Sequence, residues 1–135
     1  MNKPIRKAVR CYLIKNNKVV VIKYKKENKK VGYYDIPGGK IEKEELPEQT
    51  AIREMKEETG LDVTKLKYKG NMIIEYPDRI FDFGVFVATE AEGKPQEYEE
   101  NSSEWIEIQE LLQKEKLINL CDLMCIQGRK VFTNR

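Results

Sequence analysis

Runs of hydrophobic residues, in one case alternating with polar ones, predict six extended segments along the chain. Two pairs of these segments are joined by short turns, at residues 15–18 and 77–79, and are predicted to form hairpins. After the second turn the apolar side chains alternate from Phe81 onward, which indicates one buried face. The six segments are residues 8–14, 19–24, 33–36, 66–76, 80–89 and 103–108.

A helix is predicted over residues 47–59, where apolar residues recur at intervals of three and four. Pro47 suits the first helical position, where its missing N–H costs nothing, and Gly60 suits the left-handed residue that closes a helix. Leu46 is a poor N-cap, so the start of the helix is less well defined than its end. The residues predicted to face a sheet are Ala51, Ile52, Met55 and Thr59.

A second helical region is predicted from residue 110 to about residue 127, where apolar residues, mostly leucines, are frequent. The order of strands, helix, strands and helix indicates an α/β sandwich. A chain of 135 residues fits one domain, and no repeat, low-complexity tract or long linker divides residues 1–135.

Composition excludes several classes of chemistry. The chain has no histidine, which excludes Ser-His-Asp and Cys-His catalysis, histidine zinc sites and a histidine general base. Its three cysteines, Cys11, Cys121 and Cys125, are too few and too unevenly placed for a disulfide framework or a zinc site. The chain has neither an apolar run of ~18 residues nor the apolar core of a signal peptide. We therefore expect a cytoplasmic protein without a membrane partner.

The net charge of +2 is unevenly distributed along the sequence. Residues 1–37 contain eleven Lys and Arg against two acids, whereas residues 90–110 contain eight Glu against one Lys. A basic flank beside acidic clusters suits a polyanionic substrate that is held together with a divalent metal ion. The alternative interpretation is a solvated surface of mixed charge.

Three carboxylates fall on one side of the predicted helix. At ~100° per residue, Glu54, Glu57 and Glu58 lie within an arc of about 100°. Carboxylates this close repel one another. A bound Mg²⁺ ion, which prefers several hard oxygen ligands, would make their proximity favourable. Arg53 can hold a carboxylate by a pair of hydrogen bonds. A Gly-Gly turn at residues 38–39, where a ligand could approach the backbone closely, precedes the helix. An exposed acidic helix face is the alternative.

Residues 39–61 resemble the Nudix box, in which a glycine, a glutamate and the run Arg-Glu-aliphatic-x-Glu-Glu-x-Gly-aliphatic have fixed spacing. The match needs no gap, and only Met55 departs from it, as an unbranched residue where Leu, Ile or Val is more common. The matching residues are Gly39, Glu45, Arg53, Glu54, Glu57, Glu58, Gly60 and Leu61. Further similarity to MutT-type nucleoside triphosphate pyrophosphohydrolases lies at residues 37–42, 77–79, 92–95 and 104–105.

This resemblance implies an α/β/α sandwich around a mixed β-sheet. It also implies hydrolysis of a nucleoside diphosphate linked to a further group X, with attack of water at phosphorus. The implied cofactor is Mg²⁺, which Mn²⁺ could replace. The implied metal ligands are the backbone carbonyl of Gly38 and the carboxylates of Glu54, Glu57 and Glu58.

The implied catalytic residues are Arg53, Glu54 and Glu57. The resemblance implies that Arg53 orients a glutamate and that Glu45 is a supporting ligand, directly or through water. It implies for Glu54 the role of either a metal ligand or the general base, so the identity of the proton acceptor stays open. A further metal ligand is implied in the acidic loop. Counting back from Trp105 without a gap places it at Glu99, while Glu100 competes because one residue more or less would exchange the two. The candidate substrate-binding residues are Lys23, Lys25, Lys40 and Arg79 for phosphates, Tyr33, Tyr34 and Tyr76 for stacking, and Asn119 for a purine edge. The alternatives are surface charges for the basic residues and core packing for the tyrosines.

The sequence leaves group X open. The favoured substrate is a normal or oxidised nucleoside triphosphate, which would yield pyrophosphate and a nucleoside monophosphate. ADP-ribose, a dinucleoside polyphosphate or the triphosphorylated end of an RNA are alternatives within the same chemistry. A non-catalytic nucleotide- or RNA-binding module is a third hypothesis, and the complete set of box glutamates argues against it. We expect a nucleotide rather than a nucleic acid as partner, and a monomer or homodimer.

Overall fold

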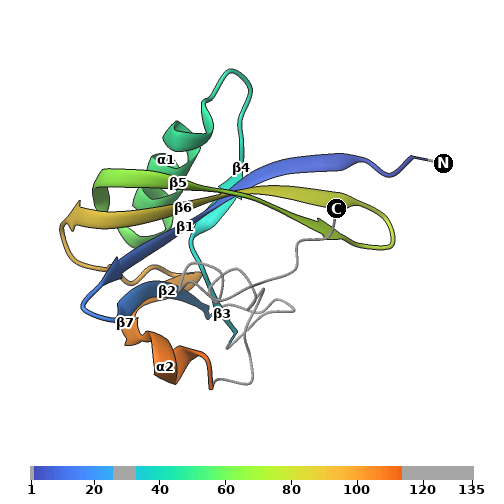
Figure 1. Ribbon diagram of the computed structural model, residues 1–135. Coiled ribbons are helices and arrows are strands. Elements are labelled where there is room, and N and C mark those ends of the chain that lie inside the picture. The colour runs from blue at the N-terminus through green and yellow to red at the C-terminus, as the bar shows by residue number, and fades with distance from the viewer. Residues whose placement is uncertain (1, 26–32, 114–135) are drawn as a thin grey trace.

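The computed structural model describes residues 2–25 and 33–113, which form seven strands and two helices (Figure 1). The predicted hairpins and the predicted helix before Gly60 are present, and the strands of the longer hairpin extend further than predicted. The elements in chain order are β1 (Ile5–Lys15), β2 (Lys18–Tyr24), β3 (Tyr34–Asp35), β4 (Gly38–Lys40), α1 (Pro47–Thr59), β5 (Asp62–Glu75), β6 (Ile80–Glu92), β7 (Asn101–Glu107) and α2 (Ile108–Leu111).

The strands form one mixed sheet, whose main path runs β3-β2-β1-β6-β5. Strand β1 pairs in parallel with β6, beginning with Ile5 opposite Ile80, and antiparallel with β2 and β4. Strands β5 and β7 pair antiparallel with β6 and β2. Helices α1 and α2 lie on opposite sides of β1 (Figure 1). This arrangement confirms the predicted α/β fold with a mixed sheet.

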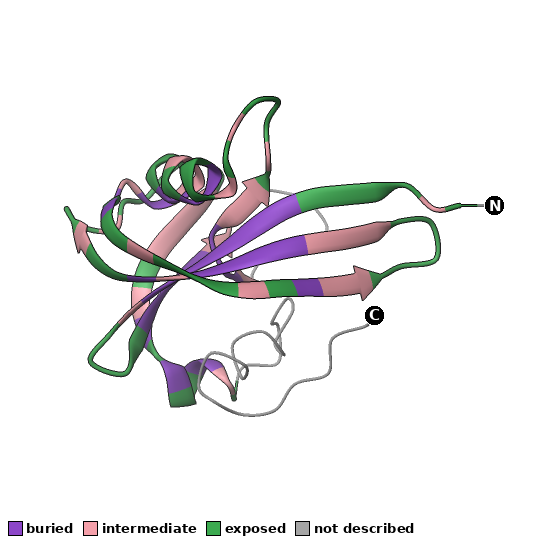
Figure 2. Cartoon of the chain, turned by 45° about the horizontal axis from the view of Figure 1, so that its top comes forward, coloured by how far each residue is buried: buried purple, intermediate pink, exposed green. Residues whose placement is uncertain are grey.

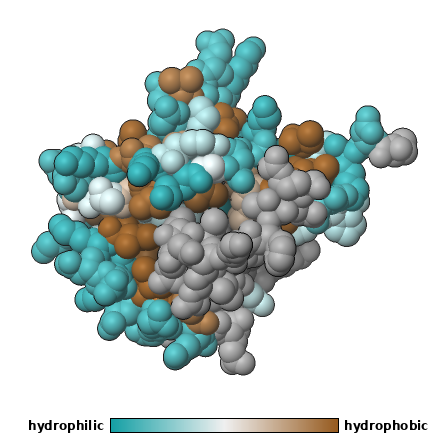
Figure 3. Space-filling view, in the orientation of Figure 1, coloured by the Kyte–Doolittle hydropathy of each residue, from teal (hydrophilic) through white to brown (hydrophobic). Residues whose placement is uncertain are grey.

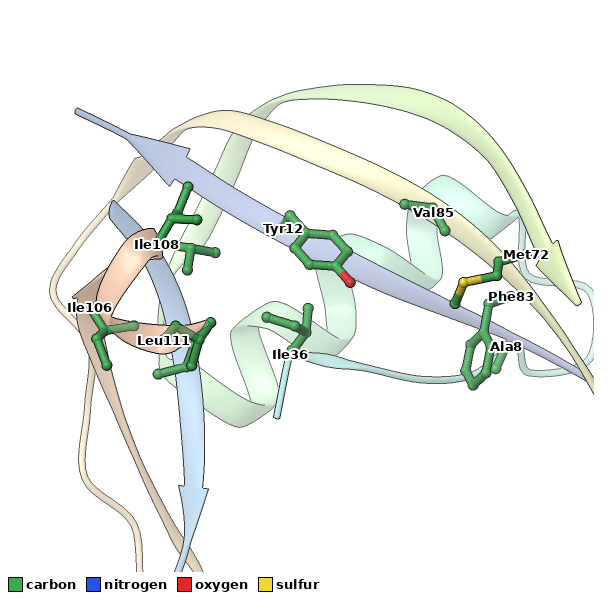
Figure 4. Packing of buried hydrophobic residues seen from close by; sticks show 11 residues of the cluster. Ala8, Tyr12, Ile36, Met72, Phe83, Val85, Ile106, Ile108 and Leu111 are labelled. Atoms are coloured by element: carbon green, nitrogen blue, oxygen red, sulfur yellow. The ribbon is translucent and has the colours of Figure 1, made fainter. Parts of the chain in front are cut away.

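Two hydrophobic clusters lie on the two faces of β1, because successive side chains of a strand point in opposite directions. The cluster in Figure 4 includes Ala8, Tyr12, Phe83 and Leu111. The cluster beneath α1 includes Val9, Leu13, Ala51 and Met55. Figure 2 shows the buried residues concentrated in the middle of the strands. Hydrophilic side chains dominate the described surface that faces the viewer in Figure 3.

Both predicted turns form as expected from their residues. Asn16 and Asn17 have φ angles of 52° and 64°, and a two-residue hairpin loop with this twist needs positive φ at both positions. Asparagine tolerates that conformation better than most residues. In the second turn the Tyr76 N–H donates to the carbonyl of Arg79 at 2.7 Å.

The Gly38-Gly39 pair is not the turn that the sequence predicts. Both residues lie in β4, where Gly38 is opposite Arg10 and Gly39 is opposite Val9 of β1. A Cβ atom on Gly38 would lie 2.1 Å from the carbonyl oxygen of Val9. The absence of a side chain at Gly38 therefore lets β4 pack closely against β1. The backbone that approaches this glycine is that of a neighbouring strand, whereas a ligand was expected there from the sequence.

The predicted inner face of the helix is wrong at one position. Ala51 and Met55 are fully buried, but Ile52 is 41% exposed. Thr50, which was not on the predicted face, is fully buried instead. The helix is thus rotated toward Thr50, and this rotation turns Glu54 and Glu58 toward the sheet.

The acidic loop predicted at residues 90–102 is shorter than expected, because β6 continues to Glu92 and β7 begins at Asn101. The second helix begins at Ile108, and the part predicted beyond residue 113 lies outside the described residues, as do Cys121 and Cys125. Neither helix in the described part of the chain is long and apolar enough to cross a membrane.

Candidate active site

Helix α1 carries the acidic residues, and its two ends are fixed locally. The Leu46 N–H donates to Oε1 of Gln49 at 2.9 Å, which satisfies one of the free donors at the start of the helix. At the other end Gly60 has a φ of 82°, and its N–H donates to the carbonyl of Lys56. The buried side chains of Ala51 and Met55 hold the helix on the sheet. The direction of each glutamate therefore follows from its position along the helix.

The Arg53 guanidinium connects the acids of the motif. Its Nη1 donates to Glu54 Oε2 at 3.1 Å and to Glu57 Oε1 at 3.2 Å, and its Nη2 donates to the carbonyl of Lys40 at 3.2 Å. It also forms two hydrogen bonds with Glu45. The pKa of the Glu45 carboxyl is lowered to about 2, chiefly because Arg53 donates to it. Arg53 thus holds the preceding loop and the helix together.

Glu58 is the most deeply placed of these acids. Its Oε1 accepts a hydrogen bond from the N–H of Gly38 at 2.9 Å, which ties the end of α1 to β4. The pKa of Glu58 is raised to about 8, chiefly by burial and with smaller contributions from the neighbouring charges of Glu54 and Asp35. Burial also raises the pKa of Glu54. Ionised carboxylates in such a setting are costly without a countercharge.

The chemistry of these donors fits a hard divalent ion, since Mg²⁺ and Mn²⁺ prefer carboxylate and carbonyl oxygens. A divalent cation would also offset the free-energy cost of ionising Glu54 and Glu58, whose pKa values are raised by burial. Within the described residues, no three acids already converge in a metal-binding arrangement. Arg53 engages Glu54 and Glu57, and the Gly38 N–H engages Glu58.

A polar cavity of about 450 Å³ lies beside the helix acids. Glu57 and Glu58 line one side, and Glu99 and Glu100 from the loop before β7 line the other. The loop is attached to this side of the molecule because the Lys25 N–H donates to the Glu100 carbonyl at 2.9 Å. The structure thus brings both predicted loop acids to the helix acids, and it does not select between them.

A larger cavity of about 790 Å³ lies next to the first, and Tyr24 and Glu58 line both. Strands β1, β3, β4 and β6 contribute most of its lining. Its aromatic lining residues are Tyr24, Tyr33, Tyr76, Phe81 and Phe83, and its basic ones are Arg6, Lys7, Arg10 and Lys40. Aromatic faces and cations together suit a ligand with a planar ring and negative charge.

The predicted substrate residues are not all brought to this cavity. Lys40 lines it, whereas the Lys23 ammonium lies 5.4 Å from the centre of the Tyr34 ring and outside the lining. Arg79 pairs with Asp78 at 2.7 Å and lines neither cavity. Asn119 lies outside the described residues. Of the tyrosines proposed for stacking, Tyr33 and Tyr76 line the cavity, while Tyr34 packs against the core.

Two functional candidates were missed by the sequence analysis. Arg10 and Asp35 line the large cavity and form a buried ion pair, with Arg10 Nη2 at 2.6 Å from Asp35 Oδ1. A signal for the first was present, because Arg10 is the one charged residue in the apolar run from Ala8 to Ile14. A charge in the middle of a buried strand needs a partner.

Comparison with known proteins identifies the family of this chain. The NUDIX domain matches residues 4–120. An 8-oxo-dGTP diphosphatase from Proteus vulgaris is 36% identical over 76 residues, which cover 56% of this chain and 68% of that protein. The 8-oxo-dGTP diphosphatase of Escherichia coli is 28% identical over 106 residues, 78% of this chain and 82% of that protein.

Solved structures show the same fold. The crystal structure of a MutT protein from Bacillus halodurans superposes with a TM-score of 0.70 at 27% identity, covering 90% of this chain and 80% of that one. A MutT NUDIX hydrolase from Burkholderia pseudomallei superposes with a TM-score of 0.79 at 19% identity, covering 94% and 100%. Because the NUDIX domain matches most of the sequence, the chain belongs to the Nudix family. Its similarity to the two 8-oxo-dGTP diphosphatases makes it a MutT-type hydrolase, with the acids of the box on α1.

Proposed function

We propose that this hydrolase cleaves a nucleoside triphosphate, preferably one with an oxidised purine, to pyrophosphate and a nucleoside monophosphate. The observation that carries the proposal is the position of Glu58, which lines both the acidic cavity and the aromatic, basic cavity. A triphosphate beside the acids would therefore leave its nucleoside directed into the larger space. The names of the two 8-oxo-dGTP diphosphatases, and of the oxidized purine nucleoside triphosphate hydrolase from Danio rerio, support this substrate class.

The proposed metal ligands are the Gly38 carbonyl and the carboxylates of Glu54, Glu57 and Glu58, with Glu99 or Glu100 from the loop. Mg²⁺, or Mn²⁺ in its place, would neutralise phosphate charge and make water more acidic. We assign the general base to Glu54 or Glu57. In the structure Arg53 contacts both of these carboxylates, so we assign it their orientation.

We assign the nucleoside to the larger cavity, where Phe83 and Tyr33 offer aromatic surface for a base. Lys40 lies at the same cavity, which Lys23 and Arg79 do not line, so we propose Lys40 as the first phosphate contact. Asn119 stays a proposal for the purine edge. The proposal further includes a cytoplasmic location and a monomeric or homodimeric state, and light scattering of the purified protein tests the latter.

The test is turnover of a panel that contains dGTP, 8-oxo-dGTP, the other nucleoside triphosphates, ADP-ribose, a dinucleoside polyphosphate and triphosphorylated RNA. We expect the highest kcat/KM for 8-oxo-dGTP with Mg²⁺ present, and pyrophosphate rather than phosphate as product. Glu57→Gln should abolish most of this activity, whereas Glu48→Gln, on the exposed first turn of the same helix, should not. A higher kcat/KM for ADP-ribose or RNA would overturn the substrate, and undiminished turnover in Glu57→Gln would overturn the site.

A further inference from the structure

A buried polar cluster forms part of the large cavity and has no role in the chemistry assigned above. Arg10 and Asp35 are only 5% and 9% exposed, and the Asp35 carboxylate accepts three hydrogen bonds. Its Oδ1 accepts from Arg10 at 2.6 Å and from the N–H of Ile36 at 2.8 Å, and its Oδ2 accepts from the Tyr24 hydroxyl at 3.0 Å. The Arg10 guanidinium also lies 5.4 Å from the centre of the Phe83 ring.

A contribution to folding stability does not by itself explain why a charged pair is buried at this position. Removing two charges from water costs several kcal/mol per ion, and apolar replacements of similar volume are often as stable as the pair they replace. What the charges add is a fixed geometry, because three donors converge on one carboxylate.

The cluster is attached to the backbone that leads to Glu58. Asp35 binds the N–H of Ile36, the Pro37 carbonyl accepts from the N–H of Cys11 at 2.8 Å, and the N–H of Gly38 donates to Glu58 at 2.9 Å. Four consecutive residues thus connect the cluster to a proposed metal-binding carboxylate. The Gly38 carbonyl, another proposed ligand, belongs to the same segment.

Arg10 contacts this segment in two ways. Its backbone is opposite Gly38 in the β1–β4 pair, and its side chain holds Asp35 three residues earlier. Tyr24 approaches from β2 and lines both cavities, so it lies between the space for the nucleoside and the space for the acids. Arg10 and Tyr24 therefore hold residues 35–38 from two neighbouring strands, both through the Asp35 carboxylate.

We propose that Arg10, Asp35 and Tyr24 are positioning residues, which hold the Gly38 backbone and through it the Glu58 carboxylate in the geometry needed for metal binding. The inference rests on the proposed function. The three residues then affect metal affinity and kcat, and they do not bind the nucleoside directly.

The test uses the full chain and a charge-neutral double variant, Arg10→Met with Asp35→Asn, beside Tyr24→Phe. The matched controls are Lys65→Met with Glu90→Gln, which removes an ion pair between β5 and β6, and Tyr68→Phe, which removes the hydroxyl that donates to Asn71. Each variant is measured for kcat, KM, Mg²⁺ affinity by calorimetry, thermal unfolding and hydrogen exchange at the Gly38 amide.

We expect Mg²⁺ affinity and kcat of the double variant to fall ~10-fold or more, as is typical when partners of metal ligands are removed. The Gly38 amide should exchange faster relative to the Gly60 amide, KM should change little, and Tyr24→Phe should show smaller changes in the same direction. The controls should match the unmodified protein in all of these measurements.

A folded double variant with unchanged metal affinity, kcat and Gly38 exchange would overturn the inference. A change in KM alone would overturn it too, because that result means direct contact with the nucleoside. If the double variant does not fold, Tyr24→Phe decides by the same criteria. If the unmodified protein turns over no nucleotide, the proposed function fails, and the exchange of the Gly38 amide still tests the positioning role.

Discussion

The Arg53 guanidinium donates two hydrogen bonds to the Glu45 carboxylate, from Nε to Oε2 at 2.7 Å and from Nη2 to Oε1 at 3.0 Å. This bidentate pair connects Glu45, in the loop after β4, to Arg53, in the middle of α1. The same guanidinium contacts Glu54 and Glu57, so one side chain determines the direction of three carboxylates. Glu45 thereby contributes to the site by holding the residue that orients the other acids.

Arg53→Lys tests this relationship, because a lysine keeps the charge and loses the planar pair of donors. We expect kcat to fall ~10–100-fold, as for other residues that orient metal ligands, while KM changes little. Steady-state kinetics over a range of Mg²⁺ concentrations measures the effect. Lys65→Arg, on the exposed surface of β5, is the control, and equal kcat values for Arg53→Lys and the unmodified protein would contradict the role.

The two glycines of β4 should respond differently to alanine. A Cβ on Gly38 would lie 2.1 Å from a backbone oxygen, so Gly38→Ala should lower the free energy of unfolding by about 1–3 kcal/mol, as overpacking does. A Cβ on Gly39 would lie 2.4 Å from Oε2 of Glu54, so Gly39→Ala should displace that carboxylate and lower kcat more than stability. Denaturant unfolding and kinetics separate the two effects. Gly84→Ala, where the nearest atom is 3.5 Å away, should be tolerated in both measurements.

The pKa of Glu58 predicts how the stability of the metal-free protein depends on pH. Burial raises this pKa from 4.5 to about 8 in the folded chain, so the unfolded chain loses the proton at lower pH than the folded chain does. The free energy of unfolding should therefore decrease as the pH rises from about 4.5 to about 8, and Glu58→Gln should remove this decrease. Urea titrations in EDTA at several pH values measure it.

Glu57→Gln is the matched control for that titration, because the Glu57 side chain is 57% exposed one position earlier on the helix. The free energy of unfolding of Glu57→Gln should still decrease as the pH rises from about 4.5 to about 8, because this variant keeps Glu58. Identical profiles for Glu58→Gln and the unmodified protein would mean that the buried carboxyl does not titrate in this range.

The rotation of α1 is testable through two apolar positions. Met55→Ala should lower the free energy of unfolding by about 2–5 kcal/mol, since Met55 is fully buried beneath the helix. Ile52→Ala should cost less than about 1 kcal/mol, because its side chain is largely exposed and alanine favours the helix. Chemical denaturation of both variants measures the difference, and a larger loss for Ile52→Ala would mean that the helix faces the sheet as the sequence pattern suggests.

Local patterns determined much of this protein. The bounds of α1 at Pro47 and Thr59, both hairpin turns and the presence of three acids on one side of the helix follow from the sequence, because each depends on residues only a few positions apart. The resemblance to the Nudix box added the family, which the NUDIX match confirms. The roles of the individual acids stay predictions.

Tertiary structure decided what depends on segments distant in the chain. The pairing of β4 with β1 and the ion pair between Arg10 and Asp35 join residues that are 25 or more positions apart, and no local period reports such contacts. The exposure of Ile52 likewise depends on where the sheet lies, since a helix of this composition could bury either of two neighbouring stripes. Sequence periodicity specifies which residues share a face, and packing against the rest of the chain specifies which face is buried.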